Sequence, residues 1–127
     1  MCSSDLVLHI GPLGAGQEAK VLNNTVFAAQ LALAAEVFDL AAARGLDQQA
    51  VATVLADGSG RSYAAEVLTG MGFDLAALAP FAGGLLAKDV GILADHAALT
   101  DSTLIAAADV ALSRMSVARS RSGGDRT

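Results

Sequence analysis

The feature that most constrains this chain is a helical pattern that starts near Gly14 or Gly16 and runs without a break to about Ala43. Apolar residues recur along it at intervals of three and four, over a surface too wide for a helix covered on one side only. We therefore expect a long helix at the centre of a bundle, buried on more than one side. The residues of this apolar surface are Leu22, Val26, Phe27, Leu31, Leu33, Ala34, Val37, Phe38, Leu40 and Ala41.

Composition supports an all-α fold. At 127 residues the chain fits one domain with one core. Hydrophobic residues make up 54% of the chain, and the excess comes from alanine and leucine, which favour helices over strands. Charges interrupt the apolar runs every few residues, and none of the runs reaches the length of a membrane span. We therefore expect no membrane-spanning segment.

Charge and cysteine content limit the classes of function. The net charge is −5, with 12 acidic and four basic side chains in residues 1–113 and an arginine-rich stretch after them. Because an acidic body repels phosphates, we predict no nucleic-acid partner. The single cysteine, Cys2, excludes an internal disulfide and a cysteine-based zinc site. We predict no metal site and a cytoplasmic location.

Capping and turn residues divide the remainder of the chain into shorter helices. Gly45 is typical of a helix C-terminus, and Asp47 is typical of the N-cap of the next helix. Residues 57–60 (Asp-Gly-Ser-Gly) indicate a turn, although their glycines and serine could also supply donors to a ligand carboxylate. The polar composition from Ser116 onward predicts a frayed tail. The expected helices cover residues 48–56, 62–69, 82–99 and about 102–118, with a loop or single turn at 75–80.

Lys20 and Asn24 are the first candidates for a functional site. They are four residues apart, so both side chains project from the same face of the long helix. An amine next to an amide suits a small-molecule site, although a solvated lysine and a helix-start asparagine would share this spacing. Residues 14–19 also satisfy the dinucleotide pattern G-x-G-x-x-A, but a helical pattern stands where a βαβ unit would need its second strand.

Two motifs, in this order, resemble the β-hydroxyacid dehydrogenase family, of which 3-hydroxyisobutyrate dehydrogenase is a member. The family's G-x-G-x-x-x-K-x-x-x-N signature is similar to the set Gly14, Gly16, Lys20 and Asn24. Its later F-x6-K-D element is similar to Phe81, Lys88 and Asp89. The resemblance covers residues 7–125 and is to the family's C-terminal domain. It implies an all-α bundle around a long first helix, similar to the C-terminal domain of 6-phosphogluconate dehydrogenase.

The resemblance also implies roles for these residues. Lys20 would be the catalytic acid/base that takes the proton from the substrate hydroxyl while hydride passes to NAD or NADP. Asn24 would bind the substrate's hydroxyl or carboxylate, and Gly16 would let the backbone approach the site. Phe81 and Lys88 would contact the nicotinamide end of the cofactor. A lysine suits proton transfer because burial beside apolar helices weakens an amine's hold on its proton, so we expect Lys20 in an apolar cleft.

Domain organisation is the point at which the chain departs from the family. Family members begin with a Rossmann domain that carries the dinucleotide fingerprint, which this chain does not contain. The β-like run Val7 to Ile10 is similar to the last strand of that domain. We therefore expect residues 1–10 to be its remnant, residues 11–118 to form the all-α domain and residues 119–127 to form a disordered tail.

The implied function is that of a substrate-binding and catalytic-lysine domain of an NAD(P)-dependent dehydrogenase for small 3-hydroxy acids. We expect the isolated chain to be inactive without a separate Rossmann domain, so its status as an enzyme by itself stays open. The alternative is a non-catalytic helical oligomerisation module, because exposed apolar helix surface favours self-association. We expect a homo-oligomer, such as a dimer, in either case.

Overall fold

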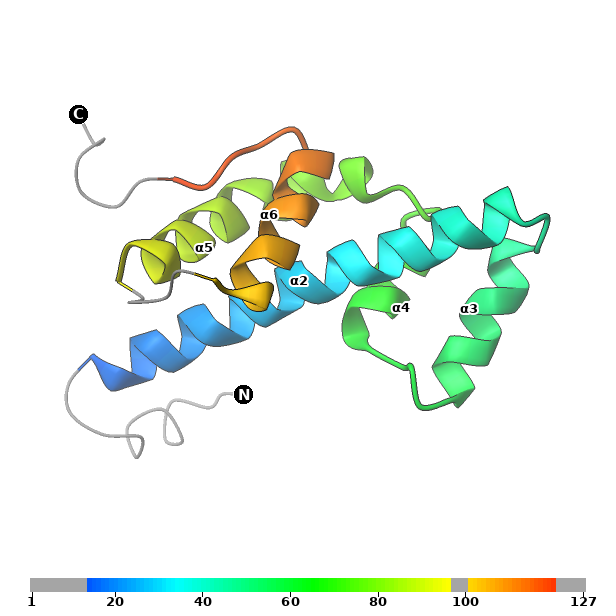
Figure 1. Ribbon diagram of the computed structural model, residues 1–127, viewed down its shortest axis with the longest axis horizontal. Helices are drawn as coiled ribbons and strands as arrows, with labels where there is room; N and C mark the ends of the chain where they lie inside the picture. Colours follow the sequence, from blue (N-terminus) through cyan, green and yellow to red (C-terminus); the bar gives the residue numbers. More distant parts are fainter. Residues whose placement is uncertain (1–13, 97–100, 121–127) are drawn as a thin grey trace.

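The computed structural model describes residues 14–96 and 101–120, and in these residues it contains five α-helices and no strand (Figure 1). The all-α class predicted from the sequence is confirmed. The predicted strand Val7 to Ile10 lies outside the described residues. The helices are α2 (Ala15–Ala43), α3 (Gln48–Asp57), α4 (Tyr63–Gly70), α5 (Gly84–His96) and α6 (Thr103–Arg114).

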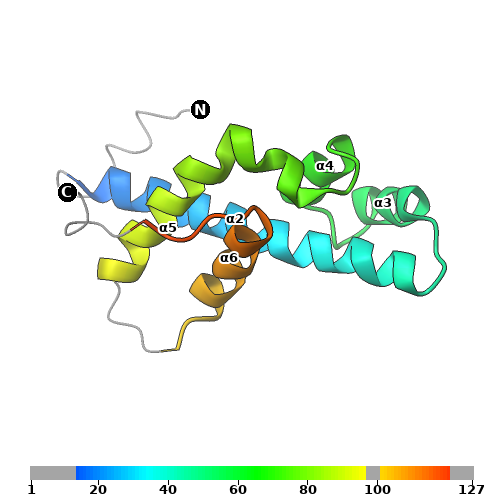
Figure 2. The same ribbon diagram turned by 90° about the horizontal axis from the view of Figure 1, so that it is seen from above.

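The long helix α2 is the axis of the bundle, as the sequence predicts. Figures 1 and 2 show α5 and α6 packed along its N-terminal half and middle, with α3 and α4 at its C-terminal end. The core lies between α2 and these helices and is built mainly from alanine and leucine around Phe38, which is fully buried. An ion pair of 2.7 Å between Arg114 and Asp39 joins α6 to α2 at the surface.

One expectation about α2 is wrong. The residues Leu22, Val26, Leu33, Val37 and Leu40 were expected in the buried surface, but between 37% and 58% of each remains exposed. The other helices pack against the sides of α2 that carry Leu31 and Phe38. The opposite side is covered only in part, because residues such as Leu33 and Val37 border an open groove with Leu55 and Arg61. The helix is therefore central to the bundle but not enclosed by it.

Local sequence signals end and start the helices much as predicted. After α2, Gly45 has φ 77° and the Leu46 amide donates to the Ala41 carbonyl over 2.8 Å, which is the closing hydrogen bond of a Schellman motif. Asp47 occupies the N-cap position of α3, although its side chain makes no capping hydrogen bond. Ser62 and Ser102 do cap α4 and α6 through their hydroxyl oxygens.

The stretch between α4 and α5 contains two turns, where the sequence predicts a loop or a single turn. Residues Leu75–Leu78 form a 3-10 turn, which starts where the Asp74 carboxylate accepts from the Ala76 amide over 3.1 Å. Residues Ala79–Gly83 form a π-helical turn that begins with Pro80 in its first turn and continues into α5. The expected start of the next helix near residue 82 is thus about right, because these turns lead directly into α5.

The C-terminal segment differs most from the expectation. Helix α6 ends at Arg114 and not near residue 118, because Ser116 adopts a left-handed conformation with φ 62° and reverses the chain. Residues 116–120 then lie against α5, where the Ser120 amide donates to the Ala87 carbonyl over 3.0 Å. This part of the predicted tail is therefore packed, while residues 121–127 lie outside the described residues.

Gly91 permits this close approach, and its replacement gives a testable prediction. A Cβ at residue 91 would lie 1.8 Å from the Ser120 carbonyl oxygen, so in Gly91→Ala the terminal segment must move away from α5. We expect a loss of about 1–3 kcal/mol in urea unfolding, which exceeds the gain of about 1 kcal/mol from alanine's helix propensity. The matched control is Gly84→Ala in the same helix, where a Cβ meets nothing within 4 Å. A Gly91→Ala protein as stable as this control would contradict the prediction.

Two segments are long and apolar enough to cross a membrane by length and composition alone. They are Gly16–Ala43, with a mean hydropathy of 1.6, and Leu75–Asp95, with a mean hydropathy of 1.4. In each of them 44% of the most apolar window is buried inside the bundle. Packing in a helical core therefore accounts for much of their apolar character.

Candidate functional site

The structure joins Asn24 on α2 to Asp89 on α5. The Asn24 Nδ2 donates a hydrogen bond of 2.6 Å to Asp89 Oδ2, although the two residues are 65 positions apart in the chain. An ionised carboxylate can only accept, so the amide must turn its nitrogen toward Asp89. Because the amide is planar, this bond also fixes the directions of its second N–H and of its oxygen. Asp89 therefore fixes the orientation in which Asn24 can meet a ligand.

Burial makes this hydrogen bond more than a surface contact. Asp89 is only 8% exposed, and Asn24 is half-buried. A buried carboxylate is costly without hydrogen-bond donors, and a charge-assisted bond to an amide offsets part of that cost. Both positions follow from helix periodicity, because Asp89 lies beside the buried residues Leu86 and Val90, and Asn24 is one turn before Ala28.

Lys20 is exposed, so the expectation of an apolar cleft around its amine is wrong. In the part of the chain that the structure describes, its side chain has no hydrogen-bond or ion-pair partner. Helix α5 reaches this end of α2 on the side of Val21, which shares an open groove of about 390 Å³ with Leu93. The side that carries Lys20 is left uncovered. The lysine therefore stands one turn beyond Asn24, on the same helix face, at the edge of the bundle.

The residues expected to meet a cofactor also lie at the surface. Phe81, in the π-helical turn, is 78% exposed, and Lys88 is an exposed residue of α5. A groove of about 340 Å³ begins at Asn24 and passes the rings of Phe27 and Tyr63, whose centroids are 5.7 Å apart. Its wall of aromatic and leucine side chains is suited to a flat, apolar group.

The glycines of the first motif take two different positions. Gly14 is the exposed N-cap residue of α2, with φ 100°, a conformation that favours glycine. Gly16 is buried in the first turn of the helix. The positive φ explains why residue 14 is a glycine. Gly16 instead lies where the first turn of α2 is buried.

Sequence reasoning included Asp89 in a motif but gave it no role. Two signals could have identified it. Asp89 falls within the apolar stripe of its helix, between Leu86 and Val90, whereas its neighbour Lys88 falls on the outer side. A carboxylate in an apolar stripe needs a partner, and the family motif that includes Asn24 supplies one.

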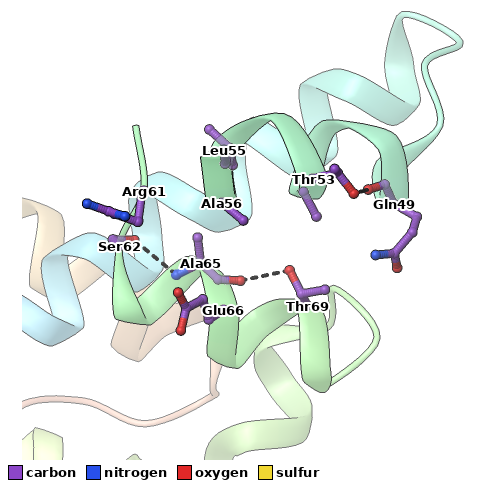
Figure 3. A pocket seen from close by; sticks show the side chains of 10 residues that line it. Gln49, Thr53, Leu55, Ala56, Arg61, Ser62, Ala65, Glu66 and Thr69 are labelled. Atoms are coloured by element: carbon purple, nitrogen blue, oxygen red, sulfur yellow. Dashed lines mark hydrogen bonds between the residues drawn. The ribbon is translucent and has the colours of Figure 1, made fainter. Parts of the chain in front are cut away.

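The turn at residues 57–60 does not form a second polar site. The cavity beside it, between α3 and α4, measures about 200 Å³ and is shown in Figure 3. Its hydroxyl groups are used within their own helices: Thr69 donates to the Ala65 carbonyl over 2.8 Å, and Ser62 accepts from the Ala65 amide over 3.0 Å. The interpretation as a turn explains these residues.

The hydrogen bond between Asn24 and Asp89 yields a prediction for the chain alone. In Asp89→Ala the Asn24 amide loses its acceptor, so we expect its side-chain N–H signals in a nitrogen–proton NMR spectrum to move and its amide protons to exchange faster. In Asp89→Asn the new carbonyl oxygen still accepts, and the wild-type signals should largely return. Identical Asn24 signals in all three proteins would show that Asp89 does not position the amide.

The comparisons with known proteins concern most of the chain. Residues 14–127 match the family model described as NAD-binding of NADP-dependent 3-hydroxyisobutyrate dehydrogenase. An NAD-dependent L-serine dehydrogenase of Pseudomonas aeruginosa is 36% identical over 114 residues, which cover 84% of this chain and 38% of the relative. The mitochondrial 3-hydroxyisobutyrate dehydrogenases of Rattus norvegicus and Homo sapiens are each 31% identical over 111 residues, covering 82% of this chain and 33% of the relative. No solved structure matches the chain significantly.

The family model and these relatives match most of the chain, and they describe NAD-binding hydroxyacid dehydrogenases. The chain belongs to the 3-hydroxyisobutyrate dehydrogenase family, through the domain that its NAD-binding model describes. The chain spans only about a third of the length of these relatives.

Proposed function

We propose that this chain supplies the substrate-binding and proton-transferring half of an NAD(P)-dependent dehydrogenase that oxidises a small 3-hydroxy acid. The observation that carries the proposal is the pairing of Asn24 with the buried Asp89, one turn from Lys20, in a chain that belongs to this family. The names of the relatives, which act on 3-hydroxyisobutyrate and L-serine, support a 3-hydroxy acid as the substrate class.

In the proposed reaction Lys20 is the general base. Its neutral Nζ takes the proton of the substrate hydroxyl. At the same time, a hydride leaves from the carbon that carries this hydroxyl, and the carbonyl forms. Bound NAD or NADP supplies the acceptor for that hydride. Asn24, held by Asp89, presents its remaining amide N–H and its oxygen to the substrate and so fixes the hydroxyl next to Lys20.

Because Lys20 is exposed, the proposed reaction requires that another surface cover its amine. An amine surrounded by water keeps its charged form solvated, whereas an amine covered by apolar surface holds its proton less tightly. Lys20 therefore needs a covering surface before it can act as a base near neutral pH. We propose that a Rossmann domain provides this surface, together with most of the contacts to the cofactor.

The chain's own surface fits one end of that cofactor. The nicotinamide is a flat ring, and the groove beside Asn24 has a wall that includes Phe27, Tyr63 and Leu85. Ala82 and Leu85 line this groove, and the exposed Phe81 and Lys88 lie one and three residues from them in the chain, respectively. In this proposal the Phe81 ring packs on the nicotinamide end and the Lys88 amine attracts a negative group.

The division of the site between two domains can be tested with the chain alone. Because most cofactor contacts belong to the second domain in this proposal, the purified chain should form no NADH or NADPH from 3-hydroxyisobutyrate or L-serine. Adding a Rossmann domain, as a separate polypeptide or fused ahead of residue 14, should restore the reaction. Turnover by the unassisted chain would refute the division of the site. The cytoplasmic location stays a prediction.

A further inference from the structure

The segment that follows α6 lies on the side of α5 that faces away from α2 (Figure 1). We call residues 116–120 the strap. The Ser120 amide donates to the Ala87 carbonyl over 3.0 Å, and its own carbonyl oxygen lies directly against Gly91. Asp89, two residues before Gly91, points to nearly the opposite side of the helix, because each residue turns an α-helix by about 100°. Helix α5 therefore lies between the strap and α2.

The strap covers a row of small residues on α5 and on the turn before it. Gly83, Ala87 and Gly91 are spaced by four, so they share one face, and all three are buried. A Cβ at residue 83 would lie 3.6 Å from Val117 Cγ1, which is an ordinary contact. A Cβ at residue 91 would lie only 1.8 Å from the Ser120 carbonyl oxygen. The strap therefore fits this face closely, and at Gly91 it leaves no room for a side chain.

The strap is anchored to α6, which in turn packs on α2. At its start the left-handed Ser116 reverses the chain, and the Val117 amide donates to the Leu112 carbonyl over 2.9 Å, which closes a Schellman motif at the end of α6. Further along, Arg119 Nε lies 3.1 Å from the carboxylate of Asp109 on α6. A closed path of contacts therefore runs from α2 through α6 and the strap to α5, and from α5 back to α2.

This path ends at the candidate site, because α5 carries Asp89. A helix of 13 residues is marginal by itself, so the position of α5 depends on the groups that pack against it. Asp89 accepts from the Asn24 amide at 2.6 Å only while α5 keeps its distance and rotation relative to α2. We propose that the strap clamps α5 against α2, so that Gly91, Val117 and Ser120 are positioning residues for Asn24. They act on Asn24 through α5 and Asp89.

The first test measures the Asn24 side-chain amide of the 127-residue chain in a nitrogen–proton NMR spectrum. In Gly91→Ala the added methyl group forces the strap off α5. We therefore expect the Asn24 signals to move as in Asp89→Ala, and the amide protons to exchange at least about threefold faster. Gly84→Ala adds the same group to the same helix where it meets nothing within 4 Å, and should leave these signals in place. Unchanged Asn24 signals in Gly91→Ala would overturn the proposal.

Leu68→Ala separates the clamp from a general loss of stability. The Leu68 side chain is fully buried on α4, and its truncation weakens the core at least as much as the Gly91→Ala change. Because the strap and α5 are intact in this variant, its Asn24 signals should keep their wild-type positions. Movement of these signals as large as that in Gly91→Ala would refute the clamp.

A chain that ends at Ser116 shows whether the methyl group acts through the strap. Removal of the strap should move the Asn24 signals as Gly91→Ala does. Adding Gly91→Ala to this shortened chain should then cause no further movement, because the group that the methyl would strike is gone. A chain that ends at Gly123 keeps the strap and should give wild-type signals. A second shift on adding Gly91→Ala, or an equal shift in the chain that ends at Gly123, would contradict the clamp.

The last test concerns turnover and rests on the proposed function. In the protein joined to a Rossmann domain, Gly91→Ala should lower kcat/KM for a 3-hydroxy acid by about 10- to 100-fold, because Asn24 no longer holds the hydroxyl in line with Lys20. Leu68→Ala should change it little at a temperature where both variants are folded. Equal kcat/KM for Gly91→Ala and the wild type would overturn the positioning role. A wild-type joined protein without turnover would count against the proposed function, and the NMR signals would still decide whether the clamp exists.

Discussion

Lys20→Ala, in a protein that joins this chain to a Rossmann domain, is expected to lower kcat for 3-hydroxy acid oxidation by about 10²- to 10⁴-fold. This is the range that a positioned general base contributes. Alanine removes the group that takes the hydroxyl proton, while Asn24 keeps its hydrogen bond to Asp89 and continues to bind the substrate. The expected signature is therefore a fall in kcat with a smaller change in KM, measured by steady-state formation of NADH or NADPH.

Two further variants separate proton transfer from charge. Lys20→Arg keeps a positive charge at the same place, but a guanidinium does not release its proton at neutral pH, so its kcat should fall nearly as far. Lys88→Ala removes the other lysine of the chain, which is exposed on α5, and should raise the KM for the cofactor with little effect on kcat. A Lys20→Arg protein with near wild-type kcat would show that this residue acts only through its charge.

Phe38→Ala is expected to reduce the free energy of unfolding by about 3–5 kcal/mol. The Phe38 side chain is fully buried in the core, and its ring packs against that of Phe73 with centroids 4.7 Å apart. Alanine would leave a cavity at the point where α2 meets the segment after α4. Because domains of this size are stable by only about 5–15 kcal/mol, the loss should be visible as a large shift of the urea midpoint.

The matched control for this variant is Phe81→Ala. It removes the same side chain from a position that is 78% exposed, so the free energy of unfolding should change by no more than about 0.5 kcal/mol. Equal losses from both variants would show that the core is not organised around Phe38. The comparison also separates a structural phenylalanine from one that we assign to cofactor contact.

The helices were predictable because their signals are local. The long apolar pattern and Gly45 place the end of α2 correctly, and Ser62 and Ser102 mark the starts of α4 and α6 through bonds to residues only three positions away. The end of α6 was not predictable in this way. It depends on Ser116 taking a conformation that serine seldom adopts and on a contact of the following segment with α5.

The site was predictable only in part, for the same reason. Lys20 and Asn24 share a helix face by spacing alone, but the partner of Asn24 lies 65 residues away and depends on how α2 packs on α5. The expected burial of Lys20 came from the catalytic role that the family resemblance implies, together with the apolar character of the neighbouring helices. The structure shows that composition does not reveal which side of a long helix its neighbours leave open.

The most direct test of the account is a crystal structure of the chain joined to a Rossmann domain, with the reduced cofactor and a 3-hydroxy acid bound. The account predicts that the second domain covers Lys20, that its Nζ lies within about 2.6–3.2 Å of the substrate hydroxyl oxygen, and that Asn24 contacts the same substrate while still bonded to Asp89. A structure in which Lys20 remains in solvent while the hydroxyl oxygen meets another proton acceptor would contradict it.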